Sequence, residues 1–587
     1  MAARSRPHPS PRLPAAAAPP ARSGPAWAAA LAVALAALVT YANSLGNGFV
    51  WDDPIILERQ LVAFRGIGDV LAPPRDIPQF SPDYYRPVTI ASYLFDRAVG
   101  GERPVVFHLS LVLTHAAAAL LLWALAAQLL ADRRGGHVGA LAAGLLFAVH
   151  PIHSESVAWV AGRSDVLATA FLLAALVLHG RMPWSWRGGL ASGVAAAGAL
   201  GAKEAGVALY PLLFLRDLLL APARRSLGTW LRGYAGVAVA GLVYILLRRH
   251  ALGEFVGTAP GITPAPRPLL EIAAAVGVYV GKLLWPWPLN AYIDQIAVGP
   301  LSLGLAALFV AALAAAAWRW RAGGDALPLF ALAWVGLTLT PSLAILWKIP
   351  DAPLAERYLY LPSAGLCLLV GALAAQAWAG AASALARTAL AGGAAAVLGA
   401  AVLATAARNP VWRDDVALWV DTEAHSQVSG MAARNLGTAY QKAGRITEAR
   451  AAFARALALR NDPGGLQTIH TNLGTLALLD GDYAAARAAY ERALAATPDA
   501  PDTLFNLGLV VLQGGGSTPD AARAALPHFE RAGQLNPHDA DFETALAQAY
   551  LILGERQRGC EHLRRAQILR PSERTAAGIQ QLLADCP

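Results

Sequence analysis

Two neighbouring carboxylates, Asp52 and Asp53, end the stretch "NSLGNGFVWDD", which follows the first long apolar segment of the chain. A helix that only anchors a protein in a membrane needs no paired acids just past its end. One carboxylate there could act as a general base for a hydroxyl group, which typically accelerates a reaction by about 10²–10⁴-fold. The second carboxylate could orient that hydroxyl group or shift the pKa of the first carboxylate through like-charge repulsion. The structural alternative is that the pair caps the next short helix.

Charged and polar side chains recur in four later loops, each next to an apolar segment. Ionisable residues at membrane depth are costly, so their presence indicates a functional site. If these loops lie on one side of the membrane, their side chains can meet in a single pocket, where the cations would bind an anionic group. The candidates are Arg86 in "YYRP"; His150, His153, Glu155 and Arg163 in "HPIHSESVAWVAGRSD"; Lys203 and Glu204 in "GAKEAG"; and Glu356 and Arg357 in "APLAERYLYLPSAG".

Each of these groups also has a structural interpretation. His150 and His153 could form a helix-capping turn, and the pairs at 203–204 and 356–357 could be ion pairs that close helix ends. The two histidines with Glu155 could also ligate a metal ion, but their spacing is short for a zinc site. We therefore predict a site without a metal. A divalent ion that bridges the paired aspartates to a phosphate is the alternative.

The elements that must hold these residues are apolar helices. The chain has 587 residues, of which 56% are hydrophobic and 15% are charged, whereas soluble proteins carry about 25% charged residues. A membrane-spanning helix needs about 20 apolar residues. The predicted spans are 26–43, 105–130, 138–150 with its extension, 164–180, 187–201, 205–220, 229–247, 301–318, 325–347, 361–380 and 388–407, which makes eleven. A twelfth apolar segment, 268–285, ends in "WPWP" and is expected to lie in or against the membrane without crossing.

Basic residues set the expected orientation, because cytoplasmic loops are enriched in Lys and Arg. Arginines precede the first apolar segment and then fall in alternate loops, with Arg248 and Arg249 as exceptions. This pattern predicts a disordered cytoplasmic tail at 1–24, a retained first helix, a first outer loop at 44–104, and a C-terminal third outside the cytoplasm. The formal net charge of +8 therefore reflects membrane topology, and no nucleic-acid-binding pattern accompanies it.

A helical repeat follows the apolar segments. Leu-Gly pairs occur at 436–437, 473–474 and 507–508, and the last two are 34 residues apart, which is the tetratricopeptide period. The small residues would let two helices approach closely, and an aromatic ring in the second helix would fill the gap. Such solenoids present a concave surface that can dock a protein, or they serve as spacers.

The predicted fold is therefore all-α, with a polytopic membrane domain followed by a tetratricopeptide α-solenoid. The membrane domain is expected at 25–407 and the solenoid at 408–587. The predicted repeats lie at about 430–463, 467–500, 501–539 and 540–573, with a cap at 574–587.

The three cysteines, Cys367, Cys560 and Cys586, make neither a disulfide framework nor a zinc site. Cys560 opens one predicted helix of the solenoid and Cys586 ends the next. Because those ends are neighbours in an antiparallel pair, a disulfide between the two is a hypothesis that an oxidising compartment would allow.

The order of these motifs resembles a known family. The segments are "FVWDD", "YYRPVTIASYLFD", "FHLSLVLTHAAAALL", "LLFAVHPIHSESVAWVAGRSDVLA", "GAKEAG" and "LAERYLYLPSAG", followed by the repeats. Together they are similar to the transmembrane O-mannosyltransferases that carry tetratricopeptide repeats, and to their bacterial relatives. The resemblance covers nearly the whole chain from residue 26, apart from a poorly matched region at 250–300.

The resemblance implies a C-type glycosyltransferase, a multi-helix membrane enzyme that takes a sugar, here mannose, from a polyprenyl phosphate. The acceptor would be a hydroxyl group, of protein Ser or Thr, on the extracytoplasmic side, with the repeats docking the acceptor or a partner. Asp52 or Asp53 would be the base, and no cofactor is expected. The Ala-rich composition favours a bacterial protein, for which the inner membrane is the expected location. In a eukaryote the expected location is the endoplasmic reticulum membrane.

Two other function classes stay open at this point. A non-catalytic membrane scaffold could use the repeats to recruit envelope or secretory proteins, but it would need no cluster of outward acids and cations. A transporter also places charges inside a membrane domain, but its charges would lie near the midplane between inverted repeats. Neither feature is evident in this sequence.

Overall fold

The computed structural model describes residues 26–61, 64, 66–73, 84–220, 226–253, 268–346, 353–426, 428–569, 573–584 and 586. The predicted tail at 1–24 lies outside these residues. Within them every regular secondary-structure element is a helix, apart from two isolated β-bridges that join Ile293 to Leu354 and Ser429 to Arg460. The all-α prediction is therefore confirmed.

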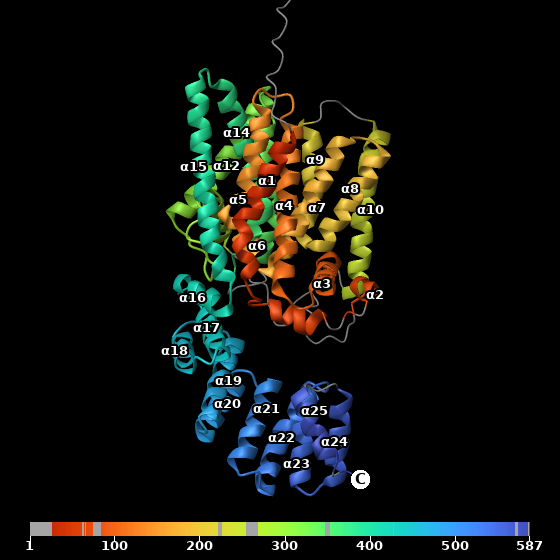
Figure 1. Ribbon diagram of the computed structural model, residues 1–587, viewed down its shortest axis with the longest axis vertical. Coiled ribbons are helices and arrows are strands. Elements are labelled where there is room, and N and C mark those ends of the chain that lie inside the picture. The colour runs from red at the N-terminus through yellow and green to blue at the C-terminus, as the bar shows by residue number, and fades with distance from the viewer. Residues whose placement is uncertain are drawn as a thin grey trace, which may run out of the picture.

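The membrane domain is a bundle of long apolar helices that run side by side (Figure 1). Its helices are α1 (Ala26–Tyr41), α4 (Pro104–Leu129), α5 (Gly136–Val149), α7 (Arg163–Arg181), α8 (Trp186–Ala202), α9 (Leu209–Leu220), α10 (Leu227–Leu252), α11 (Leu269–Leu284), α12 (Pro300–Arg321), α13 (Leu327–Ile345), α14 (Tyr360–Gly380) and α15 (Ala384–Arg408). One hydrophobic core joins α1, α4, α5, α7, α8, α9, α10, α13 and α14.

Eight helices in the described part of the chain are long and apolar enough to cross a membrane: α1, α4, α7, α10, α12, α13, α14 and α15. The pair formed by α5 and 151–158, bent by 44°, would make nine. The predicted spans at 187–201 and 205–220 are present as α8 and α9, which have 17 and 12 residues. They are short because the chain leaves α8 at Lys203 and turns through 204–208 before α9 begins. The number eleven stays a prediction.

Three further helices lie at the end of the bundle that faces the solenoid (Figure 1). They are α2 (Ile67–Leu71), α3 (Pro87–Gly100) and α6 (Ser154–Ala158). Helix α3 lies in the predicted first outer loop, and its residue Tyr93 packs in a small core with Leu57, Leu61 and Phe107. The loop that carries the paired aspartates is therefore packed against the bundle.

The solenoid consists of antiparallel helix pairs that continue from α15 (Figure 1). A connecting helix, α16 (Asp415–His425), leads to α17 (Met431–Lys442), α18 (Ile446–Leu457), α19 (Pro463–Leu479), α20 (Tyr483–Ala496), α21 (Pro501–Gly514), α22 (Pro519–Leu535), α23 (Ala540–Ile552), α24 (Arg556–Ile568) and the capping helix α25 (Glu573–Leu583). Two helices begin before their predicted boundaries: α19 begins at Pro463, ahead of the predicted second repeat at 467, and α25 begins at Glu573, ahead of the predicted cap at 574. The boundaries of the repeats stay a prediction.

Glycines make the close helix contacts inside the repeats. A Cβ atom at Gly437 would lie 2.6 Å from the ring of Phe453, and one at Gly474 would lie 2.7 Å from the ring of Tyr490. Such distances are too short for real Cβ contacts, so only glycine lets the two helices approach this closely. The role predicted for the small residue and the ring is confirmed.

A disulfide joins Cys560 in α24 to Cys586 after α25. It ties the cap to the last repeat, where Leu563 and Ile579 share a small hydrophobic core. Cys367 is buried in α14 as a free thiol. The hypothesis drawn from the cysteine positions is confirmed.

Candidate functional site

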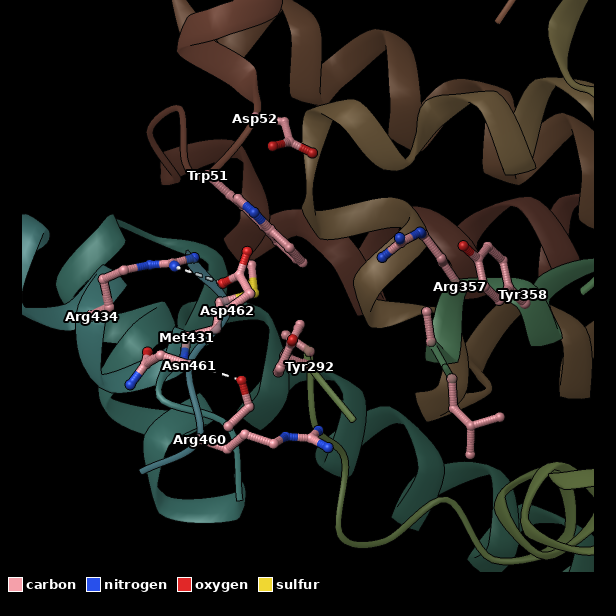
Figure 2. A pocket seen from close by; sticks show the side chains of 14 residues that line it. Trp51, Asp52, Tyr292, Arg357, Tyr358, Met431, Arg434, Arg460, Asn461 and Asp462 are labelled. Carbon is pink, nitrogen blue, oxygen red and sulfur yellow. Dashed lines mark hydrogen bonds and ion pairs between the residues drawn. The ribbon is translucent and has the colours of Figure 1, made fainter. Parts of the chain in front are cut away.

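Two cavities meet at Asp52, at the end of the bundle that faces the solenoid. The helix-end pocket has a volume of about 530 Å³ and is lined by the ends of α7, α10, α13 and α14, together with α3. The repeat pocket has a volume of about 350 Å³ and lies between loops of the membrane domain and the first repeat (Figure 2). Asp52, Arg357 and Tyr358 line both cavities. They form the boundary between the two pockets.

Trp51 holds the loop of Asp52 in an unusual conformation. Its φ angle is +57°, in the left-handed region that bulky residues rarely adopt and that often marks functional sites. The indole stacks on Trp159 with ring centroids 4.9 Å apart and meets the edge of Trp419 at 5.2 Å. The backbone N–H of Trp51 also donates to Asp415 Oδ1 at 2.8 Å. Residues just before the first repeat therefore fix the backbone that presents Asp52.

The two aspartates have different environments. Both oxygens of the buried Asp53 carboxyl accept backbone hydrogen bonds, from Val50 N at 3.1 Å and from Ala161 N at 2.8 Å. Within the described residues, the Asp52 side chain makes no hydrogen bond or ion pair, and it faces both pockets. Asp53 thus binds the backbone of two loops and does not cap the helix that follows it, which has no side-chain cap. Asp52 is the carboxylate that lines the two pockets.

The pKa values of both carboxyls are raised by burial. Desolvation raises the pKa of Asp52 above its ordinary value, and the positive charge of Arg357 opposes the rise. Desolvation raises the pKa of Asp53 to about 8, although the two backbone donors lower it. A raised pKa makes an ionised Asp52 a stronger base than an exposed aspartate.

Four cationic side chains line the helix-end pocket, and each faces an acid. Arg86 Nη2 lies 2.8 Å from Glu204 Oε2, and Arg248 Nη1 lies 3.7 Å from Glu204 Oε1. Lys203 Nζ lies 2.6 Å from both oxygens of Asp165. The remaining cation is Arg357, on the wall shared with the repeat pocket. Arg86, Lys203 and Arg357 thus line one cavity together with Arg248, whereas the predicted Arg163 does not.

Three predicted site residues lie behind the pocket walls. Glu155 is buried and binds Arg357 twice, through Nη1 at 2.5 Å and the backbone N–H at 2.8 Å. Glu356 accepts from Lys282 at 2.6 Å and from a backbone N–H at 2.8 Å. Arg163 forms a buried ion pair with Asp96 at 2.6 Å. None of the three lines either pocket, so their geometry suits positioning, and substrate contact stays a prediction for them.

The histidines lie outside both cavities and have structural partners. His150 Nδ1 accepts from Ile152 N at 3.2 Å and so caps a short helical turn. Its Nε2 lies 3.2 Å from the carbonyl of Leu283. His153 Nε2 lies 2.7 Å from Ser363 Oγ in the buried core. The geometry of His150 fits the capping interpretation, whereas the side chain of His153 caps no helix. Substrate contact stays a prediction for both histidines.

Sequence reasoning missed Asp165, Arg248 and Tyr358, which all line the helix-end pocket. Asp165 lies two residues after Arg163 in the same motif. Arg248 was visible as an exception to the positive-inside pattern. A basic residue on the outer side has a reason to be there if it lines a site, so the exception was itself a signal.

No group of three or more His, Cys, Asp or Glu side chains in the described part of the chain is arranged to hold a metal ion. Each oxygen of Asp53 already accepts a backbone hydrogen bond. The prediction of a site without a metal stays a prediction.

Comparison with known proteins adds to this geometry. A tetratricopeptide repeat family model matches residues 429–499. Protein O-mannosyl-transferase Tmtc1 of Drosophila melanogaster is 32% identical over 200 residues, which cover 32% of this chain and 23% of that protein. Protein O-mannosyl-transferase TMTC2 of Homo sapiens is 35% identical over 143 residues, which cover 23% of this chain and 17% of that protein. Over these segments the chain is similar to the protein O-mannosyl-transferases.

The resemblance inferred from the motifs is thereby confirmed. The chain spans less than a quarter of the length of these two protein O-mannosyl-transferases. Among solved structures, the chain is similar to YrrB, described as a TPR protein with an unusual peptide-binding site. That similarity has 18% identity and a TM-score of 0.23, and it covers 34% of this chain and 92% of YrrB.

Proposed function

We propose that this chain is a membrane glycosyltransferase that moves a hexose, mannose in the first instance, from a polyprenyl phosphate to a hydroxyl group of a protein. The observation that carries the proposal is the position of Asp52. Its carboxylate is free of protein partners within the described residues and lies where a cavity lined with cations meets a second cavity. The names of the relatives support the same activity.

The helix-end pocket is the proposed donor site. It lies at the ends of the membrane helices, so a polyprenyl tail can stay in the lipid while its phosphate and sugar reach the pocket. Guanidinium groups bind phosphate oxygens through forked hydrogen bonds, which Arg86, Arg248 and Arg357 can supply. Lys203 adds a point charge. Asp165 holds Lys203 in place, and Glu204 holds Arg86 and Arg248. Both acids can also accept hydrogen bonds from sugar hydroxyls.

The reaction needs one base. Asp52 accepts the proton of the acceptor hydroxyl while the hydroxyl oxygen forms a bond to C1 of the sugar. The bond between C1 and the phosphate oxygen breaks, its electron pair stays on the phosphate, and the configuration at C1 inverts. The departing phosphate is a weak base, so it leaves without a general acid. Its charge is stabilised by the fixed cations of the pocket.

The repeats belong outside the cytoplasm in this proposal. The Cys560–Cys586 disulfide supports that side, because disulfides persist in oxidising compartments. The distribution of basic residues along the chain supports the same orientation.

The test uses the full chain, purified and placed in lipid nanodiscs. It is incubated with radiolabelled polyprenyl-phosphate mannose, with other labelled polyprenyl-phosphate hexoses, and with peptides that contain threonine. We expect label to pass to peptide with time and to be lost in the Asp52→Asn variant. If folded wild-type protein moves label from no donor to any acceptor, the scaffold alternative replaces the enzyme.

A further inference from the structure

The first repeat forms one wall of the repeat pocket. Met431 and Arg434 of α17 and the turn residues Asn461 and Asp462 before α19 face Trp51 and the Asp52 loop across the cavity (Figure 2). The rest of the lining consists of Ala291, Tyr292, Leu354, Ala355, Arg357 and Tyr358 of the membrane domain, with Ser429 and Arg460 of the solenoid. A molecule in this pocket would touch the repeat and the proposed base together.

The first repeat is also fixed to the membrane domain. Asp294 Oδ2 accepts from the backbone N–H groups of Val428 and Ser429, at 3.0 and 2.9 Å. Leu436 of the repeat shares a hydrophobic core with Val50, next to the Asp52 loop. The pocket wall contributed by the repeat therefore keeps a fixed position relative to Asp52.

Arg434 is the cation of this wall that lacks a close partner. Its ion-pair partner, Asp462, lies 3.8 Å away and has a side chain that is 57% exposed, so the contact is longer than a hydrogen bond. The Arg434 side chain itself is 17% exposed and makes no hydrogen bond to a described residue. A guanidinium in this state loses water without gaining a full set of acceptors. A ligand with a carboxylate would supply them.

The composition of the pocket fits a polypeptide better than a lipid. Its lining mixes Trp51, Tyr292 and Met431 with arginines, and aromatic residues, Met and Arg are the types enriched at protein interfaces. The pocket lies on the solenoid side of Asp52, away from the helix ends that would meet the membrane (Figure 2). Donor and acceptor would thus approach Asp52 from opposite sides.

We propose that the acceptor polypeptide enters through the repeat pocket and that Arg434 binds an acidic side chain next to the hydroxyl that receives the sugar. This inference rests on the proposed function. The first repeat then belongs to the acceptor site itself and selects acceptors that carry Asp or Glu at a fixed distance from the reactive Ser or Thr.

The test compares paired peptides on the full chain in nanodiscs, with polyprenyl-phosphate mannose as donor. Each peptide has one threonine and one Asp, the Asp is moved along both sides of the threonine, and each has a twin with Asn instead. A charge-assisted hydrogen bond supports a preference of about tenfold. At one spacing we expect wild-type kcat/KM to favour the Asp peptide by that factor. Arg434→Gln should remove the preference by raising KM for the Asp peptide.

Arg487→Gln is the matched control, because Arg487 lies in the second repeat, is 62% exposed and pairs with Glu491 on the surface. It should keep the preference. A photoreactive residue at 431 should also crosslink the Asp peptide, which tests the location if Arg434→Gln folds poorly. Transfer to peptides with no Asp preference at any spacing, or a preference that survives Arg434→Gln, would overturn this inference alone. Absence of any transfer would instead count against the proposed function.

Discussion

The paired aspartates give the sharpest prediction, because Asp52 faces the pockets and Asp53 is bound to the backbone. Asp52→Asn removes a carboxylate that has no protein partner within the described residues, so the fold should not change. A general base typically accounts for about 10²–10⁴ in rate, which is about 2.7–5.4 kcal/mol of barrier at 1.36 kcal/mol per tenfold. We therefore expect Asp52→Asn to lose at least a hundredfold in kcat with an unchanged thermal midpoint.

Asp53→Asn should behave in the opposite way. Its carboxyl accepts two backbone N–H groups, and an amide can accept only one of them. The other donor would stay buried and unpaired, at a cost of about 1–3 kcal/mol. We expect a lower thermal midpoint for this variant.

The assay for both variants is the initial rate of label transfer in nanodiscs at saturating donor, beside a melting curve of each protein. Glu102→Gln is the matched control, because Glu102 lies in the same predicted outer loop with a side chain that is 71% exposed. It should leave both readouts unchanged. An Asp52→Asn variant that keeps more than about a tenth of wild-type kcat would refute the assignment of the base.

Three further predictions follow from the contacts around the site. Arg357→Gln removes the charge that lowers the pKa of Asp52, so the acidic limb of the kcat/KM profile for acceptor should move to higher pH; an unmoved limb would contradict this coupling. Glu155→Gln loosens Arg357 from behind the pocket and should raise KM for the donor more than KM for the acceptor. Cys560→Ser removes the disulfide that closes a loop of 26 residues. On chain-entropy grounds it should lower the free energy of unfolding of the solenoid by about 3.5 kcal/mol. Urea unfolding measures this difference, with the free thiol of Cys586 alkylated in the variant.

Patterns with a short physical cause were predictable from sequence. The repeats were predictable because each needs a glycine in its first helix where the ring of its second helix packs, as between Gly474 and Tyr490. The convergence of charged loops was predictable because a charge next to an apolar span needs a polar surrounding. Arg86 and Lys203 lie in one pocket for that reason.

Pairings across the fold were not predictable. The neighbours at 203–204 and 356–357 were candidates for local ion pairs, yet each residue pairs with a distant one. Lys203 binds Asp165, and Arg357 binds Glu155, 202 positions away. Adjacent residues at a helix start point in different directions, so their partners depend on which helices lie beside them. That information is in the packing of the bundle and not in the spacing of the motif.

The junction between the domains bears on the choice between an acceptor site and a spacer. A spacer needs only a covalent link to the membrane domain, and it gains nothing from packing against a catalytic loop. Here the ring of Trp412 stacks on Trp159, and the ring of Trp419 contacts the ring of Trp51, so the segment that leads into the repeats packs against the loop that carries Asp52. These contacts stabilise the unfavourable backbone conformation of Trp51. The position of the proposed base and the position of the first repeat are therefore set by the same contacts, as expected if both bind one substrate.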